Sequence, residues 1–448
     1  MFRWNLAWLL IVPALTAFGF IVHATAPPPD KEYELVRTIV DVLAEVDKNY
    51  VRELSPDEKR KLVEEMINGG LDRLDEYSRY FNEEELRAFD TQTEGQFGGI
   101  GVTLGRDPRT QYLRVESPLP GTPAYDAGIL AGDLILKVDD KPTDRLRTEE
   151  VRAIIKGKPG TKLKLTTARE GDTAPKDIEL TRATIVIHAV KGLRRNAADP
   201  AQWDWLLDDG SKIALIRLVT FSEKSDKEVK DAVEKAESQG AKGIILDLRE
   251  NPGGLLSQAA TVADLFLNEG TIVSTADKRG DTNKAPRRTL SARADGTIFE
   301  PAANRPMVVL VNRNSASSAE ILAAALQDHK RAIVVGERSY GKGSVQKIFP
   351  LNNNRAAVKL TTEVWLTPNG KNIHRWPDSK ETDEWGVKPD AGGEVLLTPE
   401  QRLAYLQNLR DLDQVSGKPV AGVAPKAPTA FTDPVIAKAD ELLKPKLK

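Results

Sequence analysis

Apolar residues near the start of the chain recur at helical spacing. Within residues 27–92, Leu35, Ile39 and Leu43 lie four positions apart, so they share one face of a helix. The same spacing returns between residues 62 and 71. We therefore predict a small N-terminal helical region over this range.

The pattern changes to short β-branched runs over residues 93–186. Gly and Pro separate these runs, as in a sheet with tight turns. One stretch near the end of the range, TEEVRAIIKG, has helical spacing instead. These features predict a compact, β-rich module.

Strand-like and helix-like segments alternate over residues 187–395. The apolar runs are KIALIRLV, GIILDLR, PMVVLVN and AIVVGE, and the helical patterns between them are KEVKDAVEKAESQ, LSQAATVADLFL and SAEILAAALQ. Such alternation indicates an α/β layer with largely parallel strands. The predicted fold class is therefore multidomain α/β.

Both ends of the chain differ from these patterns. Residues 1–26 contain one Arg, a nearly uninterrupted apolar run and then Ala-Thr-Ala before three prolines, which is typical of an export signal. The run is near the lower length limit of a membrane-spanning helix, so a cleaved signal peptide and a retained membrane anchor both stay open. We expect the rest of the protein outside the cytoplasm, in the periplasm or cell envelope. Residues 396–448 form a tail with helical patterns around an Ala/Pro/Lys linker near 416–430.

Charge and composition exclude several classes of protein. The chain has 64 Lys and Arg against 66 Asp and Glu, a net charge of −2, which gives no attraction for nucleic acid. It contains no cysteine, which excludes disulfides, thiolate metal sites and cysteine nucleophiles. The sequence has no His-Glu-x-x-His or comparable metal-ligand spacing. We expect neither a metal nor an organic cofactor.

The segment VVGERSYGKGSVQ, residues 334–346, is similar at first sight to a phosphate-binding loop. Such a loop needs Ser or Thr directly after its Lys, followed by a helix. Here Gly343 follows Lys342, and the next residues, SVQKIFPL, have the pattern of a strand. A nucleotide-binding protein is therefore disfavoured, and ATP is not expected to stabilise the protein.

Lys342 has a second use as a general base, for which burial must lower its pKa. Its candidate nucleophile is Ser317, where an apolar strand has ended and a helix begins, so that free amides can stabilise an oxyanion. Two alternatives stay open: Ser317 and Glu320 also match a helix capping box, and Lys342 also fits a solvated loop lysine. His329 lies at a predicted helix end, where capping is more common than a Ser-His catalytic pair.

These residues resemble the active-site block of the C-terminal processing peptidases, also called tail-specific proteases. That family consists of Ser-Lys endopeptidases with a PDZ domain. In SASSAEILAAALQDHKRAIVVGERSYGKGSVQ, Ser317 matches the nucleophile and Lys342 matches the base. Gln346 matches the glutamine that orients the lysine. The resemblance covers about residues 35 to 390.

The resemblance also implies an oxyanion hole. LDLRENPGGLLSQAATVADLFL is similar to the segment that supplies a glycine amide, here Gly253 or Gly254, beside the amide of Ser318. Three features depart from the usual pattern: His329, the order Ser318-Ala319, and a charged insertion at 377–384. The insertion leaves detail of the substrate groove open.

LDEYSRYF resembles the family's segment just before its PDZ domain. The PDZ domain itself is implied by FGGIGV, PAYDAGILAGDLILKVDDKP and TEEVRAIIKGKPGTKLKLTTAREG in order. The resemblance then divides the chain into a helical region at 27–92, a PDZ domain at 93–186, a crotonase-like α/β peptidase core at 187–395 and a helical tail at 396–448. Backbone amides of a PDZ carboxylate loop bind a terminal carboxylate, and the adjacent strand edge adds a peptide strand. The implied loop residues are Phe97, Gly98, Gly99, Ile100 and Gly101.

The family implies a serine endopeptidase that recognises free, mostly apolar C-termini of protein or peptide substrates. The alternative is a catalytically inactive PDZ scaffold that only captures such termini. Intact Ser317, Lys342 and Gln346 count against the scaffold. A homodimer through the terminal helices is left open.

Overall fold

The computed structural model describes residues 31–208, 210, 212–277, 286–299, 305–415 and 431–447. The export segment expected at 1–26 and the linker expected near 416–430 lie outside these residues. Among the described residues, no helix is both long and apolar enough to cross a membrane. The chain divides into two compact units, Met1–Leu74 and Asp75–Lys448.

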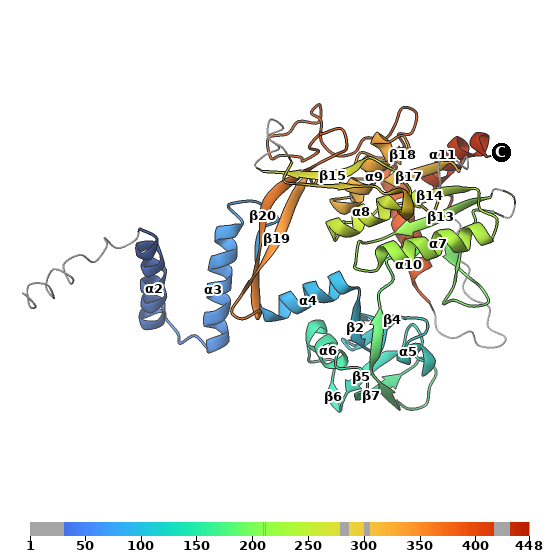
Figure 1. Ribbon diagram of the computed structural model, residues 1–448. Coiled ribbons are helices and arrows are strands. Elements are labelled where there is room, and N and C mark those ends of the chain that lie inside the picture. The colour runs from blue at the N-terminus through green and yellow to red at the C-terminus, as the bar shows by residue number, and fades with distance from the viewer. Residues whose placement is uncertain are drawn as a thin grey trace, which may run out of the picture. The chain divides into compact units, whose positions relative to one another are not determined.

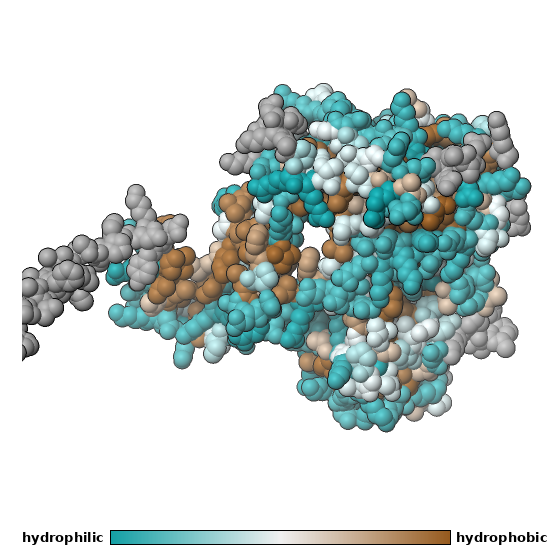
Figure 2. Space-filling view, in the orientation of Figure 1, coloured by the Kyte–Doolittle hydropathy of each residue, from teal (hydrophilic) through white to brown (hydrophobic). Residues whose placement is uncertain are grey.

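The described part of the first unit consists of helices α2 (Lys31–Asn49) and α3 (Pro56–Leu71). Ser55 caps α3, and Glu58 bonds back to the Ser55 amide to complete a capping box. Of the apolar positions predicted from helical spacing, Leu35 and Ile39 are exposed and Leu43 is half-buried, and apolar surface gathers on these helices (Figure 2). The exposed apolar side chains include Leu35, Val36, Ile39, Val40, Met66 and Ile67.

The β-rich module forms a six-stranded sheet in the order β3-β4-β5-β7-β8, with β6 beside β5, and a separate pair β2-β9. Every pairing is antiparallel. Alternating residues such as Leu113, Val115, Leu163 and Leu165 point into one core, as the period of two in a strand requires. The strands are β2 Gln96–Gly99, β3 Val102–Arg106, β4 Leu113–Pro118, β5 Leu134–Val138, β6 Lys141–Pro142, β7 Lys162–Ala168, β8 Lys176–Thr181 and β9 Ala183–Val186, and the helices are α4 Glu83–Glu94, α5 Pro123–Asp126 and α6 Thr148–Ile155.

The predicted α/β layer is confirmed as a sheet in the order β10-β13-β14-β17-β18. Figure 1 labels its strands β13, β14, β17 and β18. The last four strands are parallel and β10 is antiparallel at the edge. Ala214 and Ile216 face the helices α7, α8 and α9, whereas Ile213 and Leu215 face α11 at the chain's end. Both faces are thus buried, which explains the continuous apolar runs in these strands. The bounds are β10 Val190–Lys191, β13 Ile213–Leu218, α7 Ser225–Ser238, β14 Gly243–Asp247, α8 Leu256–Asp264, β17 Met307–Val311, α9 Ser318–Asp328, β18 Ile333–Gly336, α10 Pro399–Asp413 and α11 Pro434–Leu443.

A second, antiparallel sheet in the core was not predicted. Its path is β1-β20-β15-β16, and β19 pairs with β20 in a long hairpin. The strand predicted for SVQKIFPL is β19, so the segment after Lys342 leads into this hairpin. The remaining elements are β1 Arg79–Phe81, β11 Arg194–Arg195, β12 Trp203–Asp204, β15 Thr271–Ala276, β16 Arg288–Ser291, η1 Ala294–Gly296, β19 Ser344–Leu351, β20 Ala356–Leu366 and η3 Lys444–Lys446.

Candidate active site

Ser317 lies at the junction between strand β17 and helix α9. The strand ends at Val311, and a short loop leads to Ser317 at the N-cap of α9. The backbone of Ser317 has φ 54° and ψ −115°, a sparsely populated conformation for a residue with a side chain. Such strain persists only where surrounding contacts enforce it, and it is frequent at functional sites.

The hydroxyl of Ser317 is not used to cap α9. Within the described chain, Oγ makes no capping hydrogen bond, although Glu320 accepts from the Ser317 amide at 2.8 Å. The capping-box arrangement of Ser317 and Glu320, considered above as an alternative, is therefore present, but the Ser317 hydroxyl makes no capping hydrogen bond in it. The half-buried hydroxyl remains available for chemistry.

Glu320 is fully buried and accepts four hydrogen bonds. Its Oε2 accepts from the amides of Ser317 and Lys342, each at 2.8 Å. Its Oε1 accepts from the amide of Gly341 and from Ser339 Oγ, each at 2.6 Å. Burial raises the pKa of Glu320 to about 7, even though these donors favour the charged form. One carboxylate therefore fixes the backbone of Ser317 next to that of Lys342.

Lys342 lies between β18 and β19 on a firmly held backbone. Its amide is bonded to Glu320, and its carbonyl accepts from Trp365 Nε1 at 2.9 Å. Its Nζ is 4.6 Å from the centroid of the Tyr77 ring, a cation–π contact. Burial, and after it the like charge of Lys359, lowers the pKa of Lys342 to about 8. Lys342 is thus not a solvated loop lysine, and a substantial neutral fraction exists near neutral pH.

Gln346 lies on β19, where its side chain bonds residues other than Lys342. Its Nε2 donates to Ser344 Oγ at 2.9 Å and to Thr361 Oγ1 at 3.1 Å. Among the described residues, no hydrogen bond joins Lys342 Nζ to Ser317 Oγ or to Gln346. The amine is turned toward the aromatic ring, and catalytic hydrogen bonds often form only with substrate.

Two glycines after β14 approach Ser317 and the neighbouring chain closely. Gly253 has φ +98°, and a Cβ on it would lie 2.8 Å from Ser317 Cβ. Gly254 has φ +146°, and a Cβ on it would lie 2.2 Å from the carbonyl oxygen of Phe221. Neither position accommodates a side chain. The Gly253 amide donates to Asn251 Oδ1 at 2.8 Å, whereas the Gly254 amide has no partner within the described residues.

The amide of Ser318 opens α9 and, in the described part of the chain, is also without a partner. This is expected for a first-turn amide. The Ser318 hydroxyl donates to the carbonyl oxygen of Gly254 at 3.0 Å. The unusual order Ser318-Ala319 therefore has a structural use, because it ties α9 to the glycine loop.

Comparison with known proteins identifies relatives of this chain. Sequence models of two families match the chain, peptidase family S41 over residues 212–392 and a PDZ domain over residues 114–169. The carboxy-terminal-processing protease of Bartonella bacilliformis is 35% identical over 411 residues, which cover 88% of this chain and 86% of that protein. The chain belongs to the carboxy-terminal-processing protease family. It is accordingly a serine-type protease with a PDZ domain.

Two further proteins illustrate the range of this family. The carboxyl-terminal-processing protease of Synechocystis sp. is 38% identical over 354 residues, which cover 78% of this chain and 74% of that protein. The solved photosystem II D1 C-terminal processing protease is 27% identical and covers 79% of this chain and 86% of its own, with a TM-score of 0.41.

In this carboxy-terminal-processing protease, the loop expected to bind a carboxylate divides between a strand and a turn. Phe97, Gly98 and Gly99 belong to β2, which pairs with β9. Ile100 and Gly101 connect β2 to β3, and the Ile100 side chain is buried. The turn directly before the edge strand β3 is therefore made by Ile100 and Gly101.

The open edge of the PDZ sheet is partly occupied by an arginine. Leu104 of β3 is paired with Val115, whose amide and carbonyl both bond the loop before β5. The amide and carbonyl of Leu104 consequently point to the open edge, where an added peptide strand would pair. Arg152 of α6 already reaches this edge, because its Nη2 donates to the Leu104 carbonyl at 3.0 Å.

Two alternatives from the sequence are wrong for this protease. The phosphate-binding loop fails because strand β19, rather than a helix, follows Lys342. The Ser-His pair fails because His329 is the C-cap of α9, at the opposite end from Ser317. Its Nε2 lies 2.7 Å from the carbonyl oxygen of Thr271, in keeping with a structural role. No group of three or more His, Asp or Glu in the described residues is placed to hold a metal ion.

Sequence reasoning missed two residues of this site. Glu320 was visible only as a capping residue, and its contacts with the Lys342 loop depend on tertiary structure. Tyr77 lies far away in the sequence and only the fold brings it to Lys342. The insertion at 377–384 is held partly by Arg338, whose Nη1 donates to the Glu381 carbonyl at 2.9 Å.

Proposed function

We propose that this protease is an exported endopeptidase that cleaves proteins bearing free, mostly apolar C-termini. Ser317 is the nucleophile and Lys342 is the general base. The observation that carries the proposal is the pair of 2.8 Å hydrogen bonds from the amides of Ser317 and Lys342 to one oxygen of Glu320. These bonds hold a strained serine and a lysine of lowered pKa side by side.

In the proposed reaction, the neutral amine of Lys342 rotates away from Tyr77 and takes the proton of Ser317 as Oγ attacks a peptide carbonyl. The developing oxyanion accepts from the amides of Ser318 and Gly254, at about 3 kcal/mol for each donor. We favour Gly254 over Gly253 because only the Gly254 amide is free of an internal partner among the described residues.

The remaining steps begin with the proton that Lys342 has taken from Ser317. Lys342 donates it to the leaving amine, which departs and leaves an acyl ester on Ser317. Lys342, neutral again, then removes a proton from water as the water oxygen attacks the acyl carbon. The bond from that carbon to Ser317 Oγ breaks, the second product leaves with a new carboxyl group, and Lys342 returns the proton to Ser317 Oγ. Gln346 orients the amine once the lysine has turned toward Ser317.

The PDZ domain binds the free C-terminus of the substrate at the turn of Ile100 and Gly101, with the substrate chain added along β3. Residues 1–26 act as the export signal or as a membrane anchor. These two parts select the substrate and the compartment, respectively.

Mass spectrometry of peptide cleavage tests the proposal. An unstructured peptide with an apolar free C-terminus is incubated with wild type, Ser317→Ala, Lys342→Met and two matched controls, Ser257→Ala and Lys227→Met, at exposed positions. We expect cuts only with wild type and the controls. Cleavage by Ser317→Ala or Lys342→Met would overturn the assigned roles.

The same peptide with an amidated C-terminus tests recognition separately. A free carboxylate is needed for the proposed PDZ contact, so the amide is expected to be cleaved more slowly. Equal rates for the two peptides would refute C-terminal recognition while leaving the serine and lysine roles intact.

A further inference from the structure

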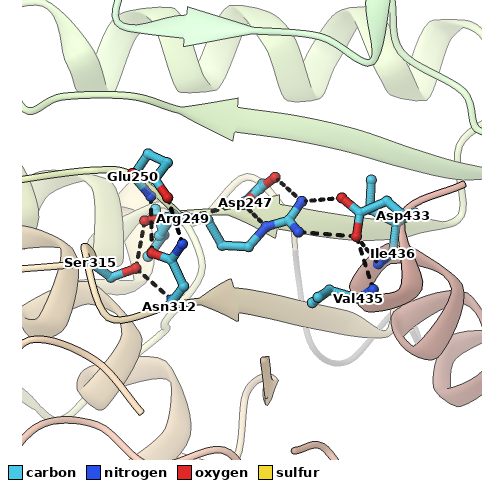
Figure 3. A network of polar contacts seen from close by, with 9 residues as sticks. Asp247, Arg249, Glu250, Asn312, Ser315, Asp433, Val435 and Ile436 are labelled. Atoms are coloured by element: carbon cyan, nitrogen blue, oxygen red, sulfur yellow. Dashed lines mark hydrogen bonds and ion pairs between the residues drawn. The ribbon is translucent and has the colours of Figure 1, made fainter. Parts of the chain in front are cut away.

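The loop that follows β14 is tied to the nucleophile loop along its length. Ser315 Oγ donates to the Leu248 carbonyl at 2.8 Å, and Asn312 Nδ2 donates to Glu250 Oε1 at 2.8 Å. The Ala316 amide donates to the Asn251 carbonyl at 2.9 Å. These bonds join the loop that carries Gly253 and Gly254 to the loop that carries Ser317 (Figure 3).

Arg249, in the same loop, points away from these bonds toward the end of the chain (Figure 3). Its guanidinium donates to both oxygens of Asp247, at 2.9 and 2.7 Å, in a bidentate pair. It also donates to Asp433 Oδ1 at 3.1 Å and lies 2.9 Å from Asp433 Oδ2. The Arg249 and Asp247 side chains are each 2% exposed and that of Asp433 is 9% exposed, so solvent hardly screens the three charges.

Both helices of the C-terminal tail contribute to this contact. Asp433 is the N-cap of α11 and accepts from the amides of Val435 and Ile436. Tyr405 of α10 places its ring 4.5 Å from Arg249 Cζ. The ring is buried, and the Tyr405 hydroxyl has no hydrogen-bond partner within the described residues, so the aromatic face is the part that contacts Arg249.

We propose that the C-terminal tail helps to position the oxyanion hole, with Arg249 as a positioning residue. Asp433 and Tyr405 hold the guanidinium, and the guanidinium fixes the start of the loop whose Gly254 amide stabilises the oxyanion. This inference rests on the proposed roles of Gly254 and Ser317. Without the Asp433 charge, the start of the loop is held less firmly. The Gly254 amide is then less well aligned with the oxyanion of the transition state.

Full-length Asp433→Asn is the first test, because Asn is also a good N-cap and keeps the start of α11. Asp440→Asn, the same substitution on the same helix away from Arg249, is the matched control. We expect kcat of Asp433→Asn to fall between about 10- and 100-fold with KM within about twofold, since a misplaced oxyanion donor acts on the transition state. Asp433→Glu, which keeps the carboxylate, should recover part of the loss.

A pair of substitutions at Tyr405 gives an independent test. Tyr405→Phe keeps the ring face and removes only the unbonded hydroxyl, so this conservative variant should recover most of the kcat that Tyr405→Leu loses. Tyr405→Leu removes the cation–π contact and should lower kcat. Thermal unfolding of every variant shows whether the substitution destabilises the fold. Measuring kcat below the unfolding midpoint of each variant keeps that effect apart from the effect on catalysis.

A peptide aldehyde separates positioning from general destabilisation. The aldehyde forms a tetrahedral adduct with a serine hydroxyl and needs the oxyanion donors, whereas the corresponding alcohol binds without them. We expect Asp433→Asn to lower the affinity for the aldehyde by the same factor as it lowers kcat. The affinity for the alcohol should stay unchanged. Full activity of Asp433→Asn and Tyr405→Leu, or a kcat loss with unchanged aldehyde affinity, would overturn the role of the tail. Cleavage by Ser317→Ala, in contrast, would refute the proposed function itself.

Discussion

The pH dependence of kcat/KM should report the ionisation of Lys342. Only the neutral amine removes a proton from Ser317, and the pKa of Lys342 is lowered from 10.5 to about 8. At pH 7 the neutral fraction is then about one in ten, against about three in ten thousand for a solvated lysine. Burial therefore raises the reactive fraction about 300-fold, equivalent to about 3 kcal/mol.

The assay is hydrolysis of a quenched fluorescent peptide with an apolar free C-terminus between pH 6 and 10. We expect log kcat/KM to rise by one unit per pH unit and to level off above about pH 8. Lys359→Gln removes the like charge that helps to lower the pKa of Lys342, so it should move the rising limb to higher pH. Lys227→Gln, an exposed lysine on α7, is the control and should leave the limb in place.

A different pH profile would assign the role of proton acceptor to a residue other than Lys342. His374 is buried, and that burial lowers its pKa from 6.5. A rising limb centred near or below pH 6.5 that does not respond to Lys359→Gln would point to this imidazole. The Lys342 mechanism would then be incorrect.

Three further changes have defined outcomes. Because the pKa of Glu320 is raised from 4.5 to about 7 on folding, the folded protein binds more protons than the unfolded chain between these pH values. The free energy of unfolding of the wild type therefore falls by about 3 kcal/mol as pH rises through that window. Glu320→Gln should remove this pH dependence, as measured by chemical denaturation. Gly253→Ala should lower kcat about 100-fold, because its Cβ would press on Ser317 Cβ, and steady-state kinetics with an unchanged kcat would contradict this. Arg152→Ala should bind C-terminal peptides about fivefold more tightly, as measured by fluorescence anisotropy. The substitution removes the hydrogen bond from Arg152 to the Leu104 carbonyl, worth about 1 kcal/mol, which competes with an added peptide strand. Weaker binding would show that Arg152 contacts the peptide instead.

The sequence predicted local features of this protease better than long-range ones. Strand β17, the turn at Ser317 and helix α9 follow from consecutive residues, because an apolar strand, a polar loop and an apolar helix stand in that order. The same is true of β19, which excludes the phosphate-binding loop. Such elements depend on periodicity within about ten residues.

Contacts between distant segments were outside the reach of that reasoning. Glu320 matched a capping box, but its bonds to the Gly341 and Lys342 amides arise only when β18 returns beside β17. The pairing of β20 with β1 likewise joins Arg79 to Lys359, 280 residues apart, and its pairing with β15 joins Ser274 to Leu366, 92 residues apart. Gly253 and Gly254 could not be distinguished from the sequence, because the difference lies in a hydrogen bond to Asn251.

The position of α11 also bears on how the newly made chain folds. This helix covers one face of the parallel sheet, and its Val435, Ala439 and Leu443 bury Ile245 and Leu310 beneath them. Until α11 has left the ribosome, that face stays open to water and to other apolar surfaces. The nascent chain therefore cannot complete its peptidase core early, and a chain that stops short of α11 should aggregate or remain inert rather than digest its neighbours.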